Sequence, residues 1–166
     1  MKVSLLTLLG LFVLVDASTL LRAEVSDKRT WSEERTWRLE VEKGHARLDY
    51  GTDNVEDIPI AFSCKAGRGL VEVWINETGK GVKTSRSMTA SLTAGRTTSK
   101  VRGKTLWNEE AGTPSFEGTQ RANDPLFAAL SKGRILAFVV GPSRDQVPLQ
   151  DIGDKADRFS RLCQKR

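Results

Sequence analysis

Histidine and cysteine are scarce in this 166-residue chain, which has one histidine, His45, and two cysteines, Cys64 and Cys163. A zinc site needs about three or four ligands, and only His45 is available beside the two cysteines, so we expect no zinc site. A Ser-His-Asp triad would have to use His45, yet no G-x-S-x-G pattern is present. Strand alternation places His45 on the outer side with Arg47 and Asp49, where we interpret it as a solvated surface residue.

Acidic residues gather in two places, but neither group has the spacing of a recognised site. The first group lies in the loop before the third expected strand and consists of Asp49, Asp53, Glu56 and Asp57. The spacing of these acidic residues differs from that of an EF-hand loop, so a solvated loop is favoured over a calcium site. The second group is Glu109, Glu110 and Glu117. Neighbours on a strand point to opposite faces, so Glu109 and Glu110 cannot form a glycosidase pair. Glu117 could join one of them from a neighbouring strand, which leaves a hydrolase as the weakest alternative.

Two short motifs have simpler explanations than a ligand site. Gly67-Arg68-Gly69 lies between two expected strands, which indicates a hairpin turn and not a phosphate-binding loop. Asn76-Glu77-Thr78 is a formal glycosylation sequon, and it has meaning only in a eukaryotic secretory pathway.

The longest apolar run lies at the N-terminus, from Leu5 to Val15, behind the positive charge of Lys2. Possible cleavage sites after a small residue follow at Ala17 and Ala23. This order of a positive charge, an apolar run and a cleavage site is typical of a secretory signal peptide. The run is too short to span a bilayer as a helix. We therefore expect a signal peptide over residues 1–23 and a soluble, periplasmic or secreted mature protein, with cleavage after either alanine left open.

Alternating apolar residues predict a mainly antiparallel β domain after the signal peptide. Residues 24–35 are polar and unpatterned, so we expect a loose leader there and a single β-rich domain over residues 36–166. Strands are predicted at 36–42, 45–50, 58–64, 70–75, 85–93, 96–101, 104–109, 115–120 and 134–140. The last of these is apolar on both faces, which predicts an interior strand. Asp124-Pro125 opens a short helix that Gly133 ends, and 150–164 forms a C-terminal helix. The predicted fold class is α+β, with the strands in a sandwich or a curled sheet.

The two cysteines fall on inward faces of different elements. Cys64 alternates with Phe62 on its strand, and Cys163 shares helical spacing with Phe159. In an oxidising compartment such a pair favours a disulfide. We expect the Cys64–Cys163 bond to hold the C-terminal helix against the sheet.

The tryptophans divide between core and surface. Trp37 alternates with apolar residues and is expected in the core, whereas Trp74 is expected to be partly exposed. Trp107 lies in a polar strand. An exposed tryptophan can bind a ligand, although packing is its commoner use.

The order of sequence features from Ile58 to Cys163 is similar to that of a known group of proteins. It begins with a strand that ends in cysteine (IPIAFSCKAG), a second strand (LVEVWI) and a polar middle, and continues with a Pro-Leu-Phe helix, an apolar strand and a helix ending in cysteine. In this order the chain resembles uncharacterised exported proteins of Gram-negative bacteria and, more distantly, the VasI-type periplasmic accessory proteins of type VI secretion. The resemblance implies a periplasmic location and a non-enzymatic role.

The net charge of +5 is mild, but the basic residues are unevenly distributed. Seven of them and no acidic residue lie between Glu77 and Glu109: Lys80, Lys83, Arg86, Arg96, Lys100, Arg102 and Lys104. Alternation predicts that Arg96, Lys100, Arg102 and Lys104 share one outer face, which could dock an anionic envelope component or an acidic protein. Solvated strand faces that only keep the protein soluble are the plainer alternative.

Three functions follow from these patterns, in descending order of support. The first is a non-catalytic binding or accessory protein of the cell envelope, the second an inhibitor of an envelope or cell-wall hydrolase, and the third a hydrolase. The first requires no cofactor, no nucleic acid and no membrane span, and we expect the protein to be a monomer.

Overall fold

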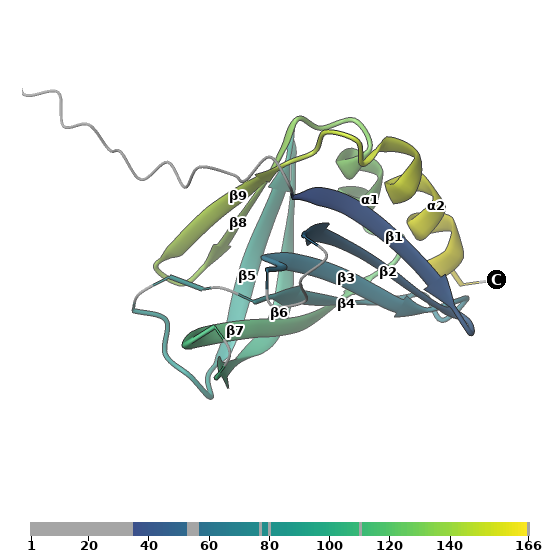
Figure 1. Ribbon diagram of the computed structural model, residues 1–166. Coiled ribbons are helices and arrows are strands. Elements are labelled where there is room, and N and C mark those ends of the chain that lie inside the picture. Colours follow the sequence, from purple (N-terminus) through teal and green to yellow (C-terminus); the bar gives the residue numbers. More distant parts are fainter. Residues whose placement is uncertain (1–34, 53–56, 77, 80, 110, 166) are drawn as a thin grey trace, which may run out of the picture. The chain divides into compact units, whose positions relative to one another are not determined.

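One curled antiparallel sheet with two helices makes up most of the protein (Figure 1). The computed structural model describes residues 35–52, 57–76, 78–79, 81–109 and 111–165. The predicted signal peptide (1–23) and almost all of the predicted leader (24–35) lie outside the described residues. The mainly antiparallel α+β fold, in its curled-sheet form, is confirmed.

Within the described residues, nine strands form a single sheet in the order β1-β2-β3-β4-β7-β6-β5-β8-β9, with every pairing antiparallel. The strands are β1 (Thr36–Glu42), β2 (His45–Gly51), β3 (Ile60–Lys65), β4 (Leu70–Ile75), β5 (Ser87–Ala94), β6 (Thr97–Asn108), β7 (Thr113–Arg121), β8 (Ile135–Val140) and β9 (Ser143–Pro148). The helices are α1 (Pro125–Leu130) and α2 (Gly153–Cys163).

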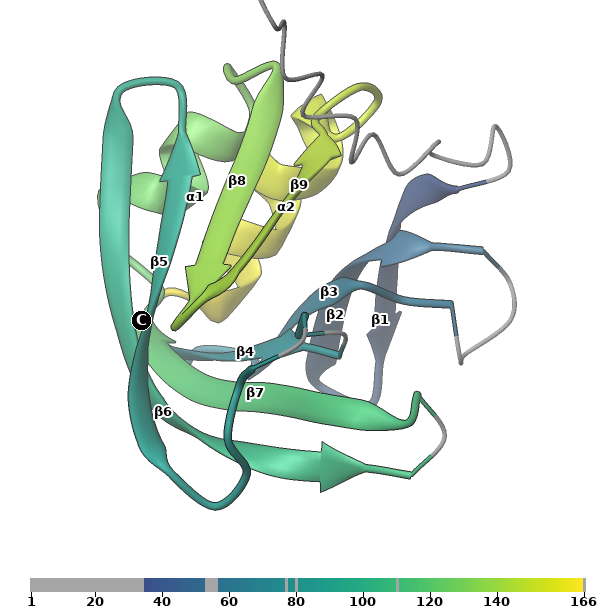
Figure 2. The same cartoon turned by 90° about the vertical axis from the view of Figure 1, so that its left-hand side faces the viewer.

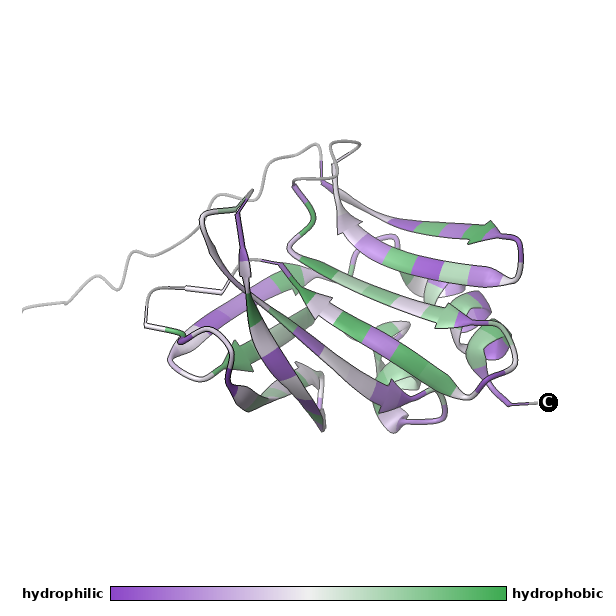
Figure 3. Ribbon diagram, turned by 90° about the horizontal axis from the view of Figure 1, so that it is seen from below, coloured by the Kyte–Doolittle hydropathy of each residue, from purple (hydrophilic) through white to green (hydrophobic). Residues whose placement is uncertain are grey.

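The sheet curls until its two edge strands approach each other (Figure 2). Trp37 on β1 donates its indole N–H to the carbonyl oxygen of Pro148 on β9 across 2.7 Å. Pro148 suits an edge strand because proline has no N–H to donate to a further strand. The alternation of polar and apolar residues along the strands is visible in Figure 3 and separates an outer face from an inner one.

The inner face packs against both helices and forms the core. Four aromatic rings form a chain through the core, and the centroids of consecutive rings are 5.7–6.5 Å apart. In order they are Trp37, Phe62, Phe127 and Phe159. The predicted cap of the first helix is confirmed, because the Asp124 carboxylate accepts a hydrogen bond from the N–H of Leu126 at 2.9 Å. None of the helices in the described part of the chain is long and apolar enough to cross a membrane.

The Cys64–Cys163 disulfide is present and joins β3 to the end of α2. Both cysteines are buried, as their inward positions predicted. The turn after β3 is attached to the same helix end, because the N–H groups of Gly67 and Gly69 donate to the carbonyls of Leu162 (2.9 Å) and Cys163 (2.8 Å).

One prediction of the strands was wrong, since the expected strands 96–101 and 104–109 are a single strand, β6. The expected gap between the two strands covers residues 102 and 103. In the structure Gly103 pairs with Gly118 of β7, and a Cβ on Gly103 would lie 2.0 Å from the Glu117 carbonyl oxygen. The ring of Phe116 lies over both glycines. Gly103 is therefore needed for close approach within a continuous strand.

The C-terminal strands confirm one expectation and correct another. β8 is interior, because it pairs with β5 on one side and β9 on the other. Only its inner face is fully buried, however, and Ile135 on the other face is 46% exposed. The sequence analysis also missed β9, whose residues are polar except for Val147 and Pro148, as an edge strand allows.

Candidate functional site

Three of the predicted basic residues lie together on the outer face of β6. Lys100, Arg102 and Lys104 occupy alternate positions of the strand, and all three side chains are exposed. Alternate residues of a strand point to the same side, so the three charges lie in one row. Their predicted placement on one outer face is confirmed.

Strand pairing adds a fourth cation to this row. Arg102 pairs with Thr119 of β7, and Arg121 follows two residues later on the same face, where it is exposed. Sequence analysis did not predict this neighbour, because Arg121 is 21 positions from Lys100 and joins the row only through the β6–β7 register. We call Lys100, Arg102, Lys104 and Arg121 the basic strip.

A small pocket continues the basic strip from Arg121 towards the C-terminus. It has a volume of about 330 Å³ and is lined by Arg68, Gly69, Leu70, Arg121, Asn123, Gln164 and Lys165. Three of these residues are cations, and none of the lining residues that the structure describes carries a carboxylate. The disulfide and the backbone bonds at Gly67 and Gly69 keep Arg68 close to the end of α2.

At its other end the basic strip meets an acidic residue. Glu117 pairs with Lys104 across β6 and β7, with 3.9 Å between the lysine nitrogen and a carboxylate oxygen. Lys104 is 60% exposed, so this ion pair is solvent-screened and contributes about 0–1 kcal/mol. The positive field is therefore strongest at the Lys100 and Arg121 end.

The remaining predicted cations lie elsewhere. The expectation that Arg96 shares the face of β6 is not met, because Arg96 lies in the two-residue turn before the strand and lines a pocket beside α1. Gly95 in that turn has a φ of 58°, which explains why the chain reverses there. Lys83 and Arg86 precede β5, and Lys80 lies outside the described residues.

Lys83 and Arg86 line a larger pocket that also contains Trp107. Its volume is about 550 Å³. Trp107 is 57% exposed although it occupies the same side of β6 as the buried Thr105. We call this the tryptophan pocket; its lining is Gly79, Gly81, Val82, Lys83, Thr84, Arg86, Trp107, Gly112, Thr113 and Pro114.

Thr105 connects the two sides of the tryptophan pocket. Its hydroxyl donates to the Lys83 carbonyl oxygen at 2.6 Å and accepts from the Arg86 N–H at 3.3 Å. Its backbone N–H donates to the Arg86 carbonyl oxygen at 3.0 Å, and its carbonyl accepts from Ser85 at 2.8 Å. The fully buried Thr105 thus holds the segment with both cations against the strand that carries Trp107.

Replacing Thr105 with valine keeps the volume but removes the hydroxyl. We expect the free energy of unfolding to fall by about 1–3 kcal/mol, because two backbone groups lose their partner in a partly buried place. Urea denaturation measures the loss. Thr119→Val, at an exposed position of β7, is the matched control and should change the stability by about 0.5 kcal/mol or less. Equal effects of the two substitutions would contradict the role assigned to Thr105.

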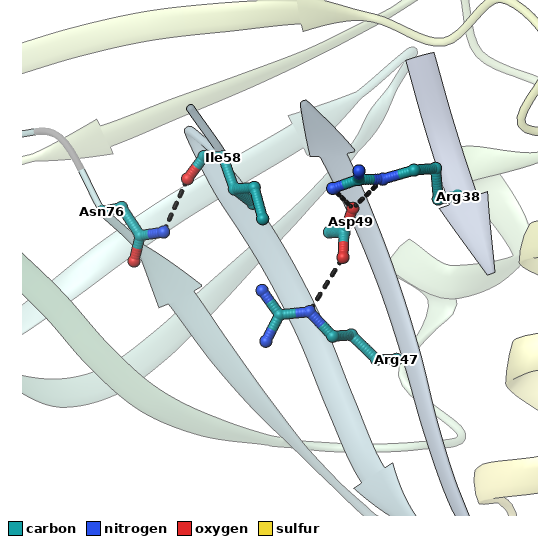
Figure 4. Close-up of polar contacts among 5 residues, drawn as sticks. All are labelled: Arg38, Arg47, Asp49, Ile58 and Asn76. Atoms are coloured by element: carbon teal, nitrogen blue, oxygen red, sulfur yellow. Dashed lines mark hydrogen bonds and ion pairs between the residues drawn. The ribbon is translucent and has the colours of Figure 1, made fainter. Parts of the chain in front are cut away.

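Asp49, expected in a solvated loop, is instead buried within β2 (Figure 4). Arg38 donates to one carboxylate oxygen through Nε (2.9 Å) and Nη2 (2.8 Å), and Arg47 donates to the other at 2.8 Å. Charges are buried when they are paired and hydrogen-bonded in this way. Arg47 lies two residues before Asp49 on the same strand, whereas Arg38 reaches Asp49 only through the pairing of β1 with β2. The prediction of solvation was therefore wrong for Asp49.

Other titratable residues do not assemble a catalytic centre in the described part of the chain. His45 is exposed at the start of β2, as expected. Glu109 and Glu117 lie at different levels of the β6–β7 hairpin, and neither lines the three pockets described above. Glu110, Asp53 and Glu56 lie outside the described residues. No group of three or more His, Cys, Asp or Glu residues in that part could hold a metal ion.

Asp57, the last member of the predicted acidic loop, forms an ion pair with Arg35 beside Tyr50. Burial raises the pKa of the Tyr50 hydroxyl above its ordinary value of 10.0, with Arg35 lowering it and Asp57 raising it to a smaller extent. The phenol therefore stays protonated at neutral pH.

The sequon residues are used in structural contacts. The side-chain nitrogen of Asn76 donates to the Ile58 carbonyl oxygen at 2.6 Å (Figure 4). The hydroxyl of Thr78, which is 1% exposed, donates to the Pro114 carbonyl oxygen. A glycan on Asn76 would have to replace the first contact.

Comparison with solved structures finds a distant structural likeness. No protein-family model and no curated protein sequence matches the chain. The chain is similar to the crystal structure of invasion associated protein B from Bartonella henselae, at 14% sequence identity and a TM-score of 0.45, over 76% of this chain and 91% of that one. A likeness at this level supports no functional argument. The resemblance to VasI-type accessory proteins stays a prediction.

Proposed function

We propose that this protein is an exported, non-catalytic binding or accessory protein that docks on an anionic component of the cell envelope through the basic strip. The observation that carries the proposal is the row of exposed cations on β6, extended by Arg121 into a pocket with Arg68 and Lys165. Exposed charges of one sign raise the local concentration of an oppositely charged partner and speed its association.

The buried disulfide supports the compartment in this proposal. Disulfides persist in oxidising compartments such as the bacterial periplasm and the cell exterior. Cys64 and Cys163 are 99 positions apart and both lie in the core, so the bond belongs to the folded structure. This agrees with the signal peptide that the sequence predicts.

The geometry of the strip also favours an extended partner. Its members are spread along one strand and onto its neighbour, and they lead into a pocket of about 330 Å³. A phosphate- or carboxylate-rich surface, such as lipid head groups or an envelope polysaccharide, presents negative charges at repeated intervals that can meet several of these cations at once. Arginine adds paired N–H donors suited to both anions.

Reversing Lys100, Arg102 and Lys104 to glutamate should abolish retention on isolated envelopes at low salt. The wild-type protein should lose retention as salt rises, since the Debye length is about 8 Å at physiological ionic strength. Retention is measured by co-sedimentation of the mature protein with envelopes over a salt series. The matched control reverses Lys43, Lys132 and Arg158, three exposed cations elsewhere that change the net charge equally.

Two outcomes would overturn this proposal. If the folded strip variant is retained as well as the wild type across the salt series, the strip is only a solvated surface. If retention disappears after protease treatment of the envelopes, the partner is an acidic protein and not a lipid or polysaccharide. Circular dichroism establishes that both variants are folded.

A further inference from the structure

The exposure of Trp107 has no explanation in the packing of the sheet. It lies two residues beyond the buried Thr105 on the same side of β6, yet it is 57% exposed. Its cross-strand neighbour is Pro114, which is buried. Leaving a large aromatic side chain in water has a cost that a bound ligand can recover, and aromatic residues are enriched where a protein binds ligands or partners.

The pocket around Trp107 is positively charged. Lys83 and Arg86 line it together with Trp107, and its described lining contains no carboxylate. Both cations are exposed, and neither has an ion-pair partner among the residues that the structure describes. They are therefore available to an anion that occupies the pocket.

The walls of the tryptophan pocket are fixed in place by hydrogen bonds. Thr105 holds the segment of Lys83 and Arg86, as described above. On the other side, the Gly79 N–H donates to the Ser143 hydroxyl oxygen at 2.6 Å. The hydroxyl of Thr113 in the wall has no hydrogen-bond partner within the described part of the chain. A site built in this way is largely preformed, which lowers the entropy cost of binding.

We propose that the tryptophan pocket binds an acidic sugar, that is, a glycan residue carrying a carboxylate. The flat indole matches the apolar C–H face of a sugar ring, while Lys83 and Arg86 bind its carboxylate by charge-assisted hydrogen bonds. The volume of about 550 Å³ lies within the usual range of small-ligand sites, about 300–1,000 Å³.

This site is separate from the basic strip. Lys104 and Trp107 are three positions apart on β6, so they lie on opposite sides of the strand. The inference goes beyond the proposed function and does not depend on it. A protein with both sites would hold an anionic surface with one face and a specific sugar with the other.

Isothermal titration of the mature, oxidised protein with a hexamer of galacturonic acid tests the inference. We expect binding to this acidic hexamer and none to maltohexaose, a neutral hexamer of equal length. Trp107→Ala should weaken binding about tenfold or more, which corresponds to about 1.4 kcal/mol. The double variant Lys83→Gln/Arg86→Gln should weaken it to a similar extent at low salt.

Matched variants distinguish binding in the tryptophan pocket from the general effect of losing an exposed apolar side chain or two positive charges. Leu70→Ala removes another exposed apolar side chain (56% exposed), and Lys132→Gln/Arg134→Gln removes one exposed lysine and one exposed arginine. Both should bind the acidic hexamer as the wild type does, and so should the strip variant with Lys100, Arg102 and Lys104 reversed. Loss of hexamer binding in the strip variant alone would assign the sugar to the strip.

Four other results would overturn the inference. They are no binding of the acidic hexamer by the wild type, equal binding of the neutral hexamer, unchanged binding by Trp107→Ala, and tighter binding of a thymidine hexanucleotide than of the acidic sugar. The last result would mean that the tryptophan stacks on bases and the cations bind phosphate. Failure here leaves envelope retention by the strip unaffected, because the two experiments use different variants.

Discussion

Replacing Cys163 by serine should lower the free energy of unfolding by about 2–5 kcal/mol. The Cys64–Cys163 bond closes a loop over 99 positions and joins α2 to β3. Without it, the unfolded chain gains freedom, and the helix is held by Phe159, Ala156 and its backbone contacts with the β3–β4 turn. Urea denaturation of the mature protein measures the difference.

The control is the wild type in reductant, which should unfold at a similar urea concentration to Cys163→Ser. Mass spectrometry of the unreduced wild type should show the loss of two hydrogens and a crosslinked peptide pair. Two free thiols in protein isolated from its exported state would contradict the expected compartment. Because the bond also holds Arg68 near Lys165, the reduced protein should be retained more weakly on envelopes.

Phe138→Ala should cost about 3–5 kcal/mol, because the ring is 2% exposed on the inner face of β8. The residue lies between Leu92 of β5 and Asp145 of β9 in the sheet, so its loss leaves a cavity against the core. Equilibrium unfolding in urea or by heat gives the value.

Ile135→Ala on the same strand is the matched control. Ile135 is 46% exposed on the opposite face, so its truncation should cost about 1 kcal/mol or less. A cost below roughly 1 kcal/mol for Phe138→Ala itself would mean that the inner face of β8 is not packed as the structure has it.

Much of the local structure was predictable from the sequence. Alternation along β1 placed Trp37 correctly in the core, although Val41 on the same face is 45% exposed, and Asp124-Pro125 indicated the start of α1. The inward positions of Cys64 and Cys163 predicted their bond. These features depend on neighbours within a few positions, where side-chain periodicity and capping are decisive.

The functional surfaces were predictable only in part. Lys100, Arg102 and Lys104 share a face because they alternate on one strand, and the sequence shows this directly. Arg121 joins them, and Glu117 meets Lys104, only because β6 pairs with β7 in one register. Sequence analysis placed Trp107 in a polar strand, but it did not predict the pocket that Trp107 forms with Lys83 and Arg86.

The sequence by itself determined which face of β2, β3 and β4 turns inward, where α1 begins, and that two cysteines on inward faces would meet. Only the tertiary structure decided that Gly103 continues a strand, that Asp49 is buried between two arginines, and that cations on β6 and β7 form one strip. The reason is physical: side-chain periodicity is a property of a few consecutive residues. Strand order and register, in contrast, depend on contacts between segments far apart in the chain, such as β4 with β7 and β5 with β8.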